Sequence, residues 1–257
     1  MSATLPEKIA RKVKTLSDSV LLAYPPNISC NLCGWQGRHF SSDSWHPQTI
    51  CPRCGSQVRH RLLAATWQET GTLSAEKILR DKKVLHIAPE KVISQVIQQY
   101  AKNYVTADFL RPGVDMKLDI TQMTEIADNT YDVFVACDVL EHVADDRQAL
   151  QEIFRILTPQ GMGIFTVPQA DDRTETLEDP SVNTPEAREK IYGQSDHVRL
   201  YGSDIEQRII DAGFQLTMID ETHFPAEQVQ KQVLFPPVLS TDPLATNYRK
   251  LYFAQKP

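Results

Sequence analysis

The pattern of apolar and polar residues predicts a strand-helix-strand unit between residues 131 and 168. Residues 133–136 form an apolar run of the kind found in parallel strands buried on both faces. The following helix carries apolar residues at helical spacing, at Leu150, Ile153, Phe154 and Leu157. Residues 158–161 (TPQG) are expected to end this helix and to turn the chain into a further strand over residues 162–167.

The same alternation of strands and helices extends from residue 82 to residue 257. Further strands are predicted from residue 82 and over residues 103–107, 114–118, 214–219 and 250–255. Ser203 and Glu206 have the spacing of a capping box, so a helix is expected to begin there and to end at Gly213. The alternation predicts an α/β fold with a doubly wound, mostly parallel sheet. Ligands of such sheets bind beyond the carboxyl ends of the strands, where Cys137, Asp138, Glu141 and His142 are expected.

Four of the five cysteines form a second motif, with two CxxCG turns at Cys30, Cys33, Cys51 and Cys54. Two residues between a pair of cysteines allow both thiolates to reach one ion. The distance along the chain between the two CxxCG turns is typical of a zinc ribbon. Two disulfides or a rubredoxin-like iron site are the alternatives. We favour structural zinc, because closed four-cysteine sites stabilise folds and leave no open position for catalysis. The fifth, Cys137, is expected to be a buried thiol at the end of a strand.

These motifs divide the chain into four predicted parts. Residues 1–26 contain a basic amphipathic helix over residues 5–24, expected to pack on the protein, with membrane-surface contact as the alternative. Residues 27–57 are the ribbon, and residues 58–81 contain a connecting helix. Residues 82–257 form the sheet domain, with an insertion over residues 169–202 that is too long for an ordinary connection and is expected to act as a lid.

Composition and charge restrict the partners of the protein. The formal net charge of −6 argues against a broad electrostatic surface for nucleic acid. No run of apolar residues resembles a signal peptide or a membrane span. We therefore expect a cytoplasmic protein whose partner is a small molecule or a glycan.

The segment YDVFVACDVLEHVADDRQALQEIFRILTPQGMGIFTVP resembles the fourth and fifth strands of class I S-adenosylmethionine-dependent methyltransferases. The resemblance implies a seven-stranded Rossmann-like sheet with an antiparallel last strand, and S-adenosylmethionine as cofactor. An acidic residue at the end of the second strand, Asp108, is placed to accept the ribose hydroxyls, with Phe109 beside it. The resemblance gives the adenine edge to Asp119 and Ile120, and it adds Cys137 and Asp138 to the cofactor-binding residues.

The first loop of the sheet domain departs from this family. Where most members have a glycine-rich turn, this chain reads HIAPE, without glycine. Ala88 is small enough to allow some close approach of the cofactor, and His86 or Glu90 are candidates to meet its methionine part. Together with CPRCGSQVRHRLL and DHVRLYG, the HIAPE loop resembles a bacterial subgroup of zinc-ribbon methyltransferases.

The residues that act on the substrate are predicted from the insertion. Asp196 and His197 are candidates to deprotonate an acceptor hydroxyl, with His142 as a further candidate, whereas Arg199 is expected to hold the loop or an anionic group. A salt bridge that pins the loop is the alternative. Arg59, His60 and Arg61 could face the cleft and hold a phosphate or an anionic sugar. Otherwise they form a solvated helix face or clamp the ribbon to the sheet.

The predicted function is methyl transfer from S-adenosylmethionine, to an oxygen of a small molecule or a glycan. Two alternatives remain. The first is a binding protein that kept the fold and lost the cofactor through its glycine-free loop. The second is an RNA methyltransferase that uses the ribbon to contact RNA.

Overall fold

The computed structural model describes residues 27–42 and 47–257, so the helix expected over residues 5–24 lies outside the described residues. The ribbon (residues 27–42 and 47–57) has two short antiparallel strands, β1 (Ile28–Ser29) and β2 (Gln36–Gly37). The helices of the rest are α2 (Val58–Gln68), α3 (Ala75–Ile78), α4 (Lys91–Tyr100), α5 (Asp146–Ile156), α6 (Pro185–Tyr192), α7 (Ile205–Asp211) and α8 (Ala226–Gln232), with single 3-10 turns at Leu140–His142 and Glu221–His223.

Seven strands form the central sheet, in the order β5-β4-β3-β6-β7-β9-β8. They are β3 (Lys83–Ile87), β4 (Asn103–Asp108), β5 (Met116–Lys117), β6 (Tyr131–Cys137), β7 (Leu157–Thr166), β8 (Gln215–Ile219) and β9 (Leu251–Gln255). All pairs are parallel except those of β9, which lies antiparallel between β7 and β8. The predicted mostly parallel, Rossmann-like methyltransferase sheet is confirmed.

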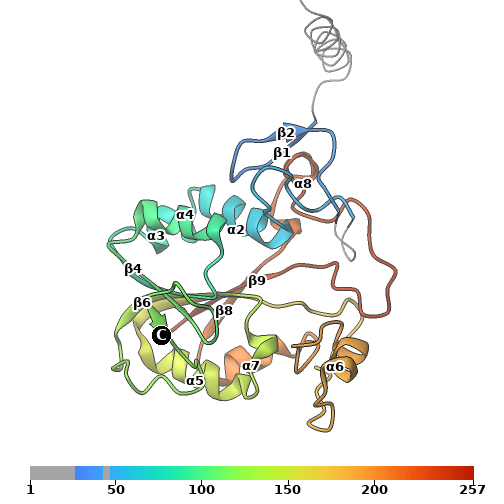
Figure 1. The fold of residues 1–257 in the computed structure, drawn as a ribbon. Coiled ribbons are helices and arrows are strands. Elements are labelled where there is room, and N and C mark those ends of the chain that lie inside the picture. Colours follow the sequence, from blue (N-terminus) through green and yellow to red (C-terminus); the bar gives the residue numbers. More distant parts are fainter. Residues whose placement is uncertain (1–26, 43–46) are drawn as a thin grey trace, which may run out of the picture.

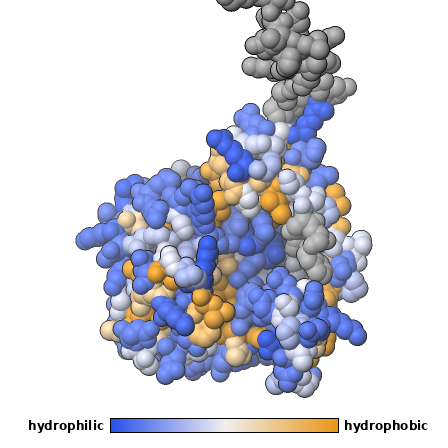
Figure 2. All heavy atoms as spheres, in the orientation of Figure 1, coloured by the Kyte–Doolittle hydropathy of each residue, from blue (hydrophilic) through white to orange (hydrophobic). Residues whose placement is uncertain are grey.

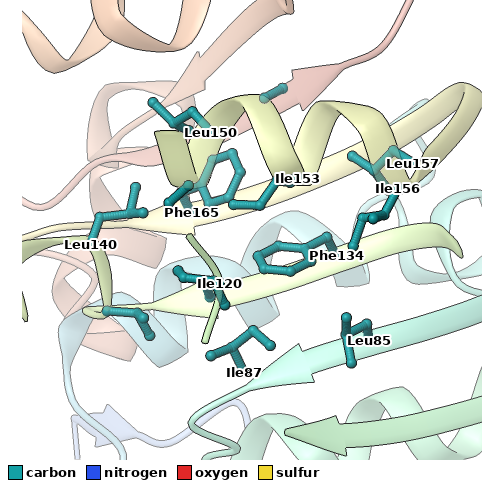
Figure 3. Packing of buried hydrophobic residues seen from close by; sticks show 14 of the residues in the cluster. Leu85, Ile87, Ile120, Phe134, Leu140, Leu150, Ile153, Ile156, Leu157 and Phe165 are labelled. Atoms are coloured by element: carbon teal, nitrogen blue, oxygen red, sulfur yellow. The ribbon is translucent and has the colours of Figure 1, made fainter. Parts of the chain in front are cut away.

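Helices cover both faces of this sheet, which lies between α2, α3 and α4 on one side and α5 and α7 on the other (Figure 1). Side chains of β6 alternate between the two cores, because successive residues of a strand point to opposite faces. Val133 and Val135 pack toward the first group of helices, and Phe134 packs toward the second. Figure 3 shows Phe134 and Phe165, from adjacent strands, beneath Leu150 and Ile153 of α5.

Two local predictions need correction. Residues 158–161 do not end the helix, because α5 ends at Ile156 and Leu157, which was expected on the helix, already begins β7. They form an irregularity within β7 rather than a turn before it, since Leu157 pairs with Tyr131 before the register shifts. Ser203 does not cap α7. The N-cap is Asp204, and the Ser203 hydroxyl instead donates to the carbonyl of Thr174, in the insertion.

The insertion between β7 and α7 is ordered around α6. Thr184 caps this helix by accepting from the backbone N–H of Ala187. Isolated bridges between Gln169 and Tyr201 and between Leu177 and Leu200 join the two ends of the insertion. Within the described residues, no helix combines the length and apolar character that crossing a membrane requires.

Candidate functional site

The four ribbon cysteines converge on one point. Their sulfur atoms all lie within 4.8 Å of one another, with Cys30 Sγ 3.7 Å from Cys54 Sγ and Cys33 Sγ 3.6 Å from Cys51 Sγ. None of the four is in a disulfide. The positions of these four sulfur atoms fit a single ion with four thiolate ligands, which is the arrangement of a structural zinc site.

Arg61, on the first turn of α2, lies directly beneath this cysteine cluster. Its guanidinium is fully buried and donates to the backbone carbonyls of Thr49, Ser56, Gln232 and Val233. No carboxylate pairs with it among the described residues, and the anionic groups that raise its pKa are Cys30, Cys51 and Cys54, although burial lowers that pKa to about 10. A buried cation needs a compensating charge. Four thiolates on a divalent ion provide that negative charge, so the surroundings of Arg61 fit a metal-bound ribbon.

The preceding residues of α2 face the cleft instead. Arg59 donates to Glu90 at 2.7 Å and lies 3.2 Å from Asp138, while His60 Nε2 lies 2.6 Å from Glu90. Arg249, just before β9, also lies 3.3 Å from Asp138. Arg59 thus lies in the cleft and Arg61 at the ribbon, while His60 is buried against Glu90.

This network controls the charge of the two carboxylates. Burial alone would raise the pKa of Asp138, but Arg59 and Arg249 outweigh it and hold that pKa below its ordinary value. The pKa of Glu90 is likewise lowered, because His60 and Arg59 outweigh burial. Burial lowers the pKa of His60, which favours its neutral form. At neutral pH the network holds two carboxylates against two guanidinium groups.

A cavity of about 300 Å³ opens beside this network, between the insertion and the segment before β9. Arg59, Asp138 and Arg249 line one part of it, and Glu141, His142 and His197 line another. The face in Figure 2 shows mainly hydrophilic side chains between the ribbon and the insertion. A polar cavity at the carboxyl ends of the strands is where α/β sheets bind ligands.

The polar end of the cavity contains a buried carboxyl group. Glu141 is only 1% exposed, and burial, followed by repulsion from Asp138, raises its pKa well above the ordinary range. His197 is 3% exposed, and burial together with His142 lowers its pKa to about 4. Its ring contacts that of His142 edge-on, with the ring centroids 4.7 Å apart.

The predicted acid-histidine pair is arranged differently from the expectation. The side chain of Asp196 is 68% exposed, and its carboxylate lies 3.4 Å from Nδ1 of His142, so it orients His142 rather than His197. Arg199 is buried, pairs with Glu178 at 2.9 Å, and donates to the carbonyls of Leu140, Val143 and Ala144. Arg199 therefore holds the insertion against the loop after β6.

The residues expected around the nucleoside lie at the ends of β4 and β5. Asp108 accepts from the backbone N–H groups of Leu110 and Arg111, and Asp119 accepts from Thr121, so each carboxylate stabilises its own turn. Phe109 is 55% exposed beside Asp108, which leaves an aromatic face open to solvent. Ile120 is buried in the core.

The loop after β3 replaces glycine with strained and charged residues. Ala88 has φ of 47°, in the left-handed region that glycine favours, and Asp138 at the end of neighbouring β6 has φ of 51°. His86 is not at the cavity, because it is fully buried and bonded to the hydroxyl of Tyr104, and burial lowers its pKa to about 4. Cys137 is also buried, and burial raises its pKa.

Several of these residues fit a cofactor with charged groups. Arg59 Nε and Glu90 Oε2 are buried without a hydrogen-bond partner among the described residues, and both lie at the glycine-free loop. A carboxylate acceptor and a guanidinium donor are the groups that an amino acid's ammonium and carboxylate require. The loop therefore retains the polar groups that a methionine moiety needs, although it lacks glycine.

The sequence missed Arg249, which lies far along the chain from Asp138 and is marked by no motif. For Arg59, the cleft was one of the placements left open. Both residues reach the cleft through contacts between distant segments, which periodicity does not report.

Comparison with known proteins agrees with this geometry. Residues 76–165 match a family model described as a methyltransferase domain. No curated protein matches the chain. Among solved structures, the YcgJ protein from Bacillus subtilis is 14% identical with a TM-score of 0.50, over 77% of this chain and 98% of that chain. The [4+2]-cyclase SpnF is 12% identical with a TM-score of 0.51, over 85% of this chain and 86% of that chain. The chain thus shares the fold of these structures, and residues 76–165 are similar to a methyltransferase domain.

Proposed function

We propose that the protein transfers a methyl group from S-adenosylmethionine to an oxygen of a small molecule or a glycan. The observation that carries this proposal is the cavity of about 300 Å³ at the carboxyl end of β6, which has charged residues on one side and a buried acid-histidine cluster on the other. Its volume is at the lower end of the range for small-molecule sites. An acceptor with hydroxyl groups suits its polar walls.

The cofactor would lie across the ends of β3, β4 and β6, where it supplies an electrophilic methyl group. Glu90 and Arg59 would hold its ammonium and carboxylate groups through the atoms that have no partner among the described residues. Asp108 would accept the ribose hydroxyls, and Asp119 with the backbone N–H of Ile120 would bind the adenine edge. Most of the rate would come from positioning and from the exclusion of water.

His197 is the residue we propose as the acceptor of the hydroxyl proton. Because its pKa is about 4, its ring is unprotonated at neutral pH and is available as a base. The orphaned Nδ1 of His197 is buried at the cavity wall, without a partner among the described residues. His142, oriented by Asp196, is its neighbour in this role.

We also propose that residues 27–57 are a structural zinc ribbon. The cysteine cluster and the buried Arg61 support this, because both require a metal-thiolate centre to satisfy their charges. Replacing Cys51 and Cys54 with Ser should remove the metal and destabilise this part of the chain. Elemental analysis that finds iron, or no metal, would contradict a zinc ribbon.

Two other functions need separate tests. A protein with this fold need not transfer methyl groups, since the similar structure SpnF is described as a cyclase. A non-catalytic protein would fail to bind S-adenosylmethionine and S-adenosylhomocysteine in calorimetry. An RNA methyltransferase would retain RNA in electrophoresis with a strong salt dependence, which the net charge of −6 disfavours.

The decisive experiment combines cofactor binding with identification of the labelled product. S-adenosylhomocysteine should bind the wild type, and Asp108→Asn should weaken binding by about 1.5–3 kcal/mol, because the charged acceptor is lost. Asparagine keeps an oxygen for the backbone N–H groups of the Asp108 turn. The exposed Asp172→Asn is the control and should bind as the wild type does.

Methyl-labelled cofactor incubated with fractionated cell extract should then place label on the oxygen of a small molecule or a glycan. Label on RNA would support the RNA methyltransferase. Equal affinity of wild type and Asp108→Asn would remove Asp108 from the cofactor site.

A further inference from the structure

We propose that Glu141, His142 and His197 form a second metal site, which binds a divalent transition metal such as Zn²⁺ at the wall of the cavity. One ligand atom from each of the three residues lies within 4.8 Å of the others. This site is separate from the cysteine ribbon, and it goes beyond the proposed methyl transfer, since a protein can bind the metal whether or not it methylates anything.

Glu141 supplies the first argument, because its carboxyl group is buried without a cationic partner. Its Oε2 has no hydrogen bond among the described residues, and the side chain is 1% exposed. The guanidinium groups that line the cavity, Arg59 and Arg249, are already held by Asp138 and Glu90. A buried carboxylate is normally paired or coordinates a metal. The cavity therefore has one carboxyl group that neither guanidinium pairs with, and a metal ion would give it a partner.

The orientation of His142 supplies the second argument. Its Nδ1 faces Asp196, at 3.3 Å from the backbone carbonyl and 3.4 Å from the carboxylate. Its Nε2 is therefore turned toward Glu141, at 3.9 Å from Oε1. A metal-binding histidine usually donates its second ring N–H to a carbonyl or a carboxylate, which fixes the ring. Asp196, which does not orient His197, has this supporting position beside His142.

In His197, as in His142, one ring nitrogen contacts the protein backbone and the other faces the proposed metal site. Its ring is hydrogen-bonded to the backbone of Tyr192, while Nδ1 is buried and has no partner among the described residues. One nitrogen is thus held by the protein and the other is free. Both histidines and Glu141 each bring one ligand atom to the same small volume.

The donor set indicates the metal and its chemistry. Two imidazole nitrogens and one carboxylate oxygen are ligands of catalytic zinc and of other divalent transition metals, and three protein ligands leave at least one position open. Here that position would face the cavity. Bonds of about 2.0–2.2 Å require the three ligand atoms to draw together slightly from their present separations. A cation in this place would polarise an acceptor oxygen and lower the pKa of its hydroxyl, and His197 would then act as a ligand rather than as the proton acceptor.

Calorimetric titration with ZnCl₂ tests the site. The protein is first brought to a filled ribbon, checked as one zinc per chain by elemental analysis. The wild type should then bind one further zinc ion per chain. Glu141→Gln and His197→Ala should each weaken this second binding by more than about 100-fold, because loss of even a supporting residue costs 10–100-fold. His223→Ala is the matched control, since His223 is an exposed histidine beside an aspartate outside the cavity, and it should bind as the wild type does.

Two further measurements separate the possible failures. The unfolding temperature of Glu141→Gln without added zinc should equal or exceed that of the wild type, because the substitution removes an unpaired buried acid and keeps its shape. Co²⁺ added to protein with a zinc-filled ribbon should give weak visible bands without an intense sulfur-to-cobalt band.

Uptake of no second zinc, or equal uptake by Glu141→Gln, His197→Ala and the wild type, would overturn the proposal. It would mean that Glu141 is simply a protonated acid in the cavity wall. Binding of S-adenosylhomocysteine is measured on the same samples, and its presence without the second zinc would leave the methyltransferase proposal intact.

Discussion

Replacing Arg61 with leucine should detach the ribbon from the sheet domain. The Arg61 side chain is fully buried and donates to four backbone carbonyls, at 2.6–2.9 Å. Two of these carbonyls, of Thr49 and Ser56, belong to the ribbon, and the others, of Gln232 and Val233, lie at the C-terminal end of α8. The guanidinium also lies 4.4 Å from the centroid of Phe40, a core residue of the ribbon. No other described side chain joins these three segments through so many bonds.

The expected loss of stability is about 3–5 kcal/mol, the range for removing one partner of a buried charged network. Each bond to a charged donor contributes about 1.5–3 kcal/mol, but the sum is smaller than four such values, because leucine no longer requires burial of a guanidinium. The lost stability should be that of the ribbon, so the ribbon should unfold locally more readily than the sheet domain. A cost of 3 kcal/mol corresponds to roughly a 100-fold change in an equilibrium constant.

Zinc release to an excess of chelator measures this local stability directly, and it avoids the assumption of one cooperative unfolding transition for the whole chain. Arg61→Leu should release its zinc roughly 100-fold faster than the wild type if the ribbon must open before the metal leaves. Arg53→Leu is the control, because Arg53 is exposed and makes a single bond to the carbonyl of Cys33. Equal release by the two variants would refute the role of Arg61 as the clamp.

Three further outcomes are expected for residues around the ends of β3 and β6. Ala88→Val should destabilise the protein by about 1–3 kcal/mol in urea unfolding, because a β-branched residue resists the left-handed backbone, whereas Ala88→Gly should change stability by no more than about 1 kcal/mol. The pKa of His86 is about 4 in the folded state, so the stability it contributes is complete above pH 6.5 and is lost as the pH falls toward 4, by about 3 kcal/mol, and His86→Gln should flatten that decline. Asp138→Asn should cost about 3 kcal/mol, because it leaves Arg59 and Arg249 without their shared carboxylate, and unchanged stability would show that solvent compensates them.

The sequence predicted the sheet because its strands are short apolar runs and its helices repeat at helical spacing. The same patterns placed Asp108, Asp119 and Asp138 at strand ends, since a strand's end follows from its apolar run. The grouping of the four cysteines could equally be predicted from the sequence, because it depends only on the local spacing of the cysteines. These features share one property, which is that the information lies within a few residues of the chain.

The contacts that the sequence could not predict join segments far apart in the chain. Asp196 was expected to orient its neighbour His197, but the backbone turns it toward His142. Ser203 has the spacing of a helix cap, yet Asp204 begins α7, because Ser203 is used to hold the insertion. Arg249 meets Asp138 only because β9 inserts next to β7. Tertiary packing decides each of these.

The first turn of α2 shows how the ribbon affects the cleft. Arg59, His60 and Arg61 are consecutive, so on a helix their side chains point in different directions around the axis. Arg61 is fixed by the ribbon, and this fixes the rotation of the helix. Arg59 and His60 are then directed toward Glu90 and Asp138. The proposed zinc ribbon would thus set the position of the charged residues at the cleft, although none of its four cysteines lines the cavity.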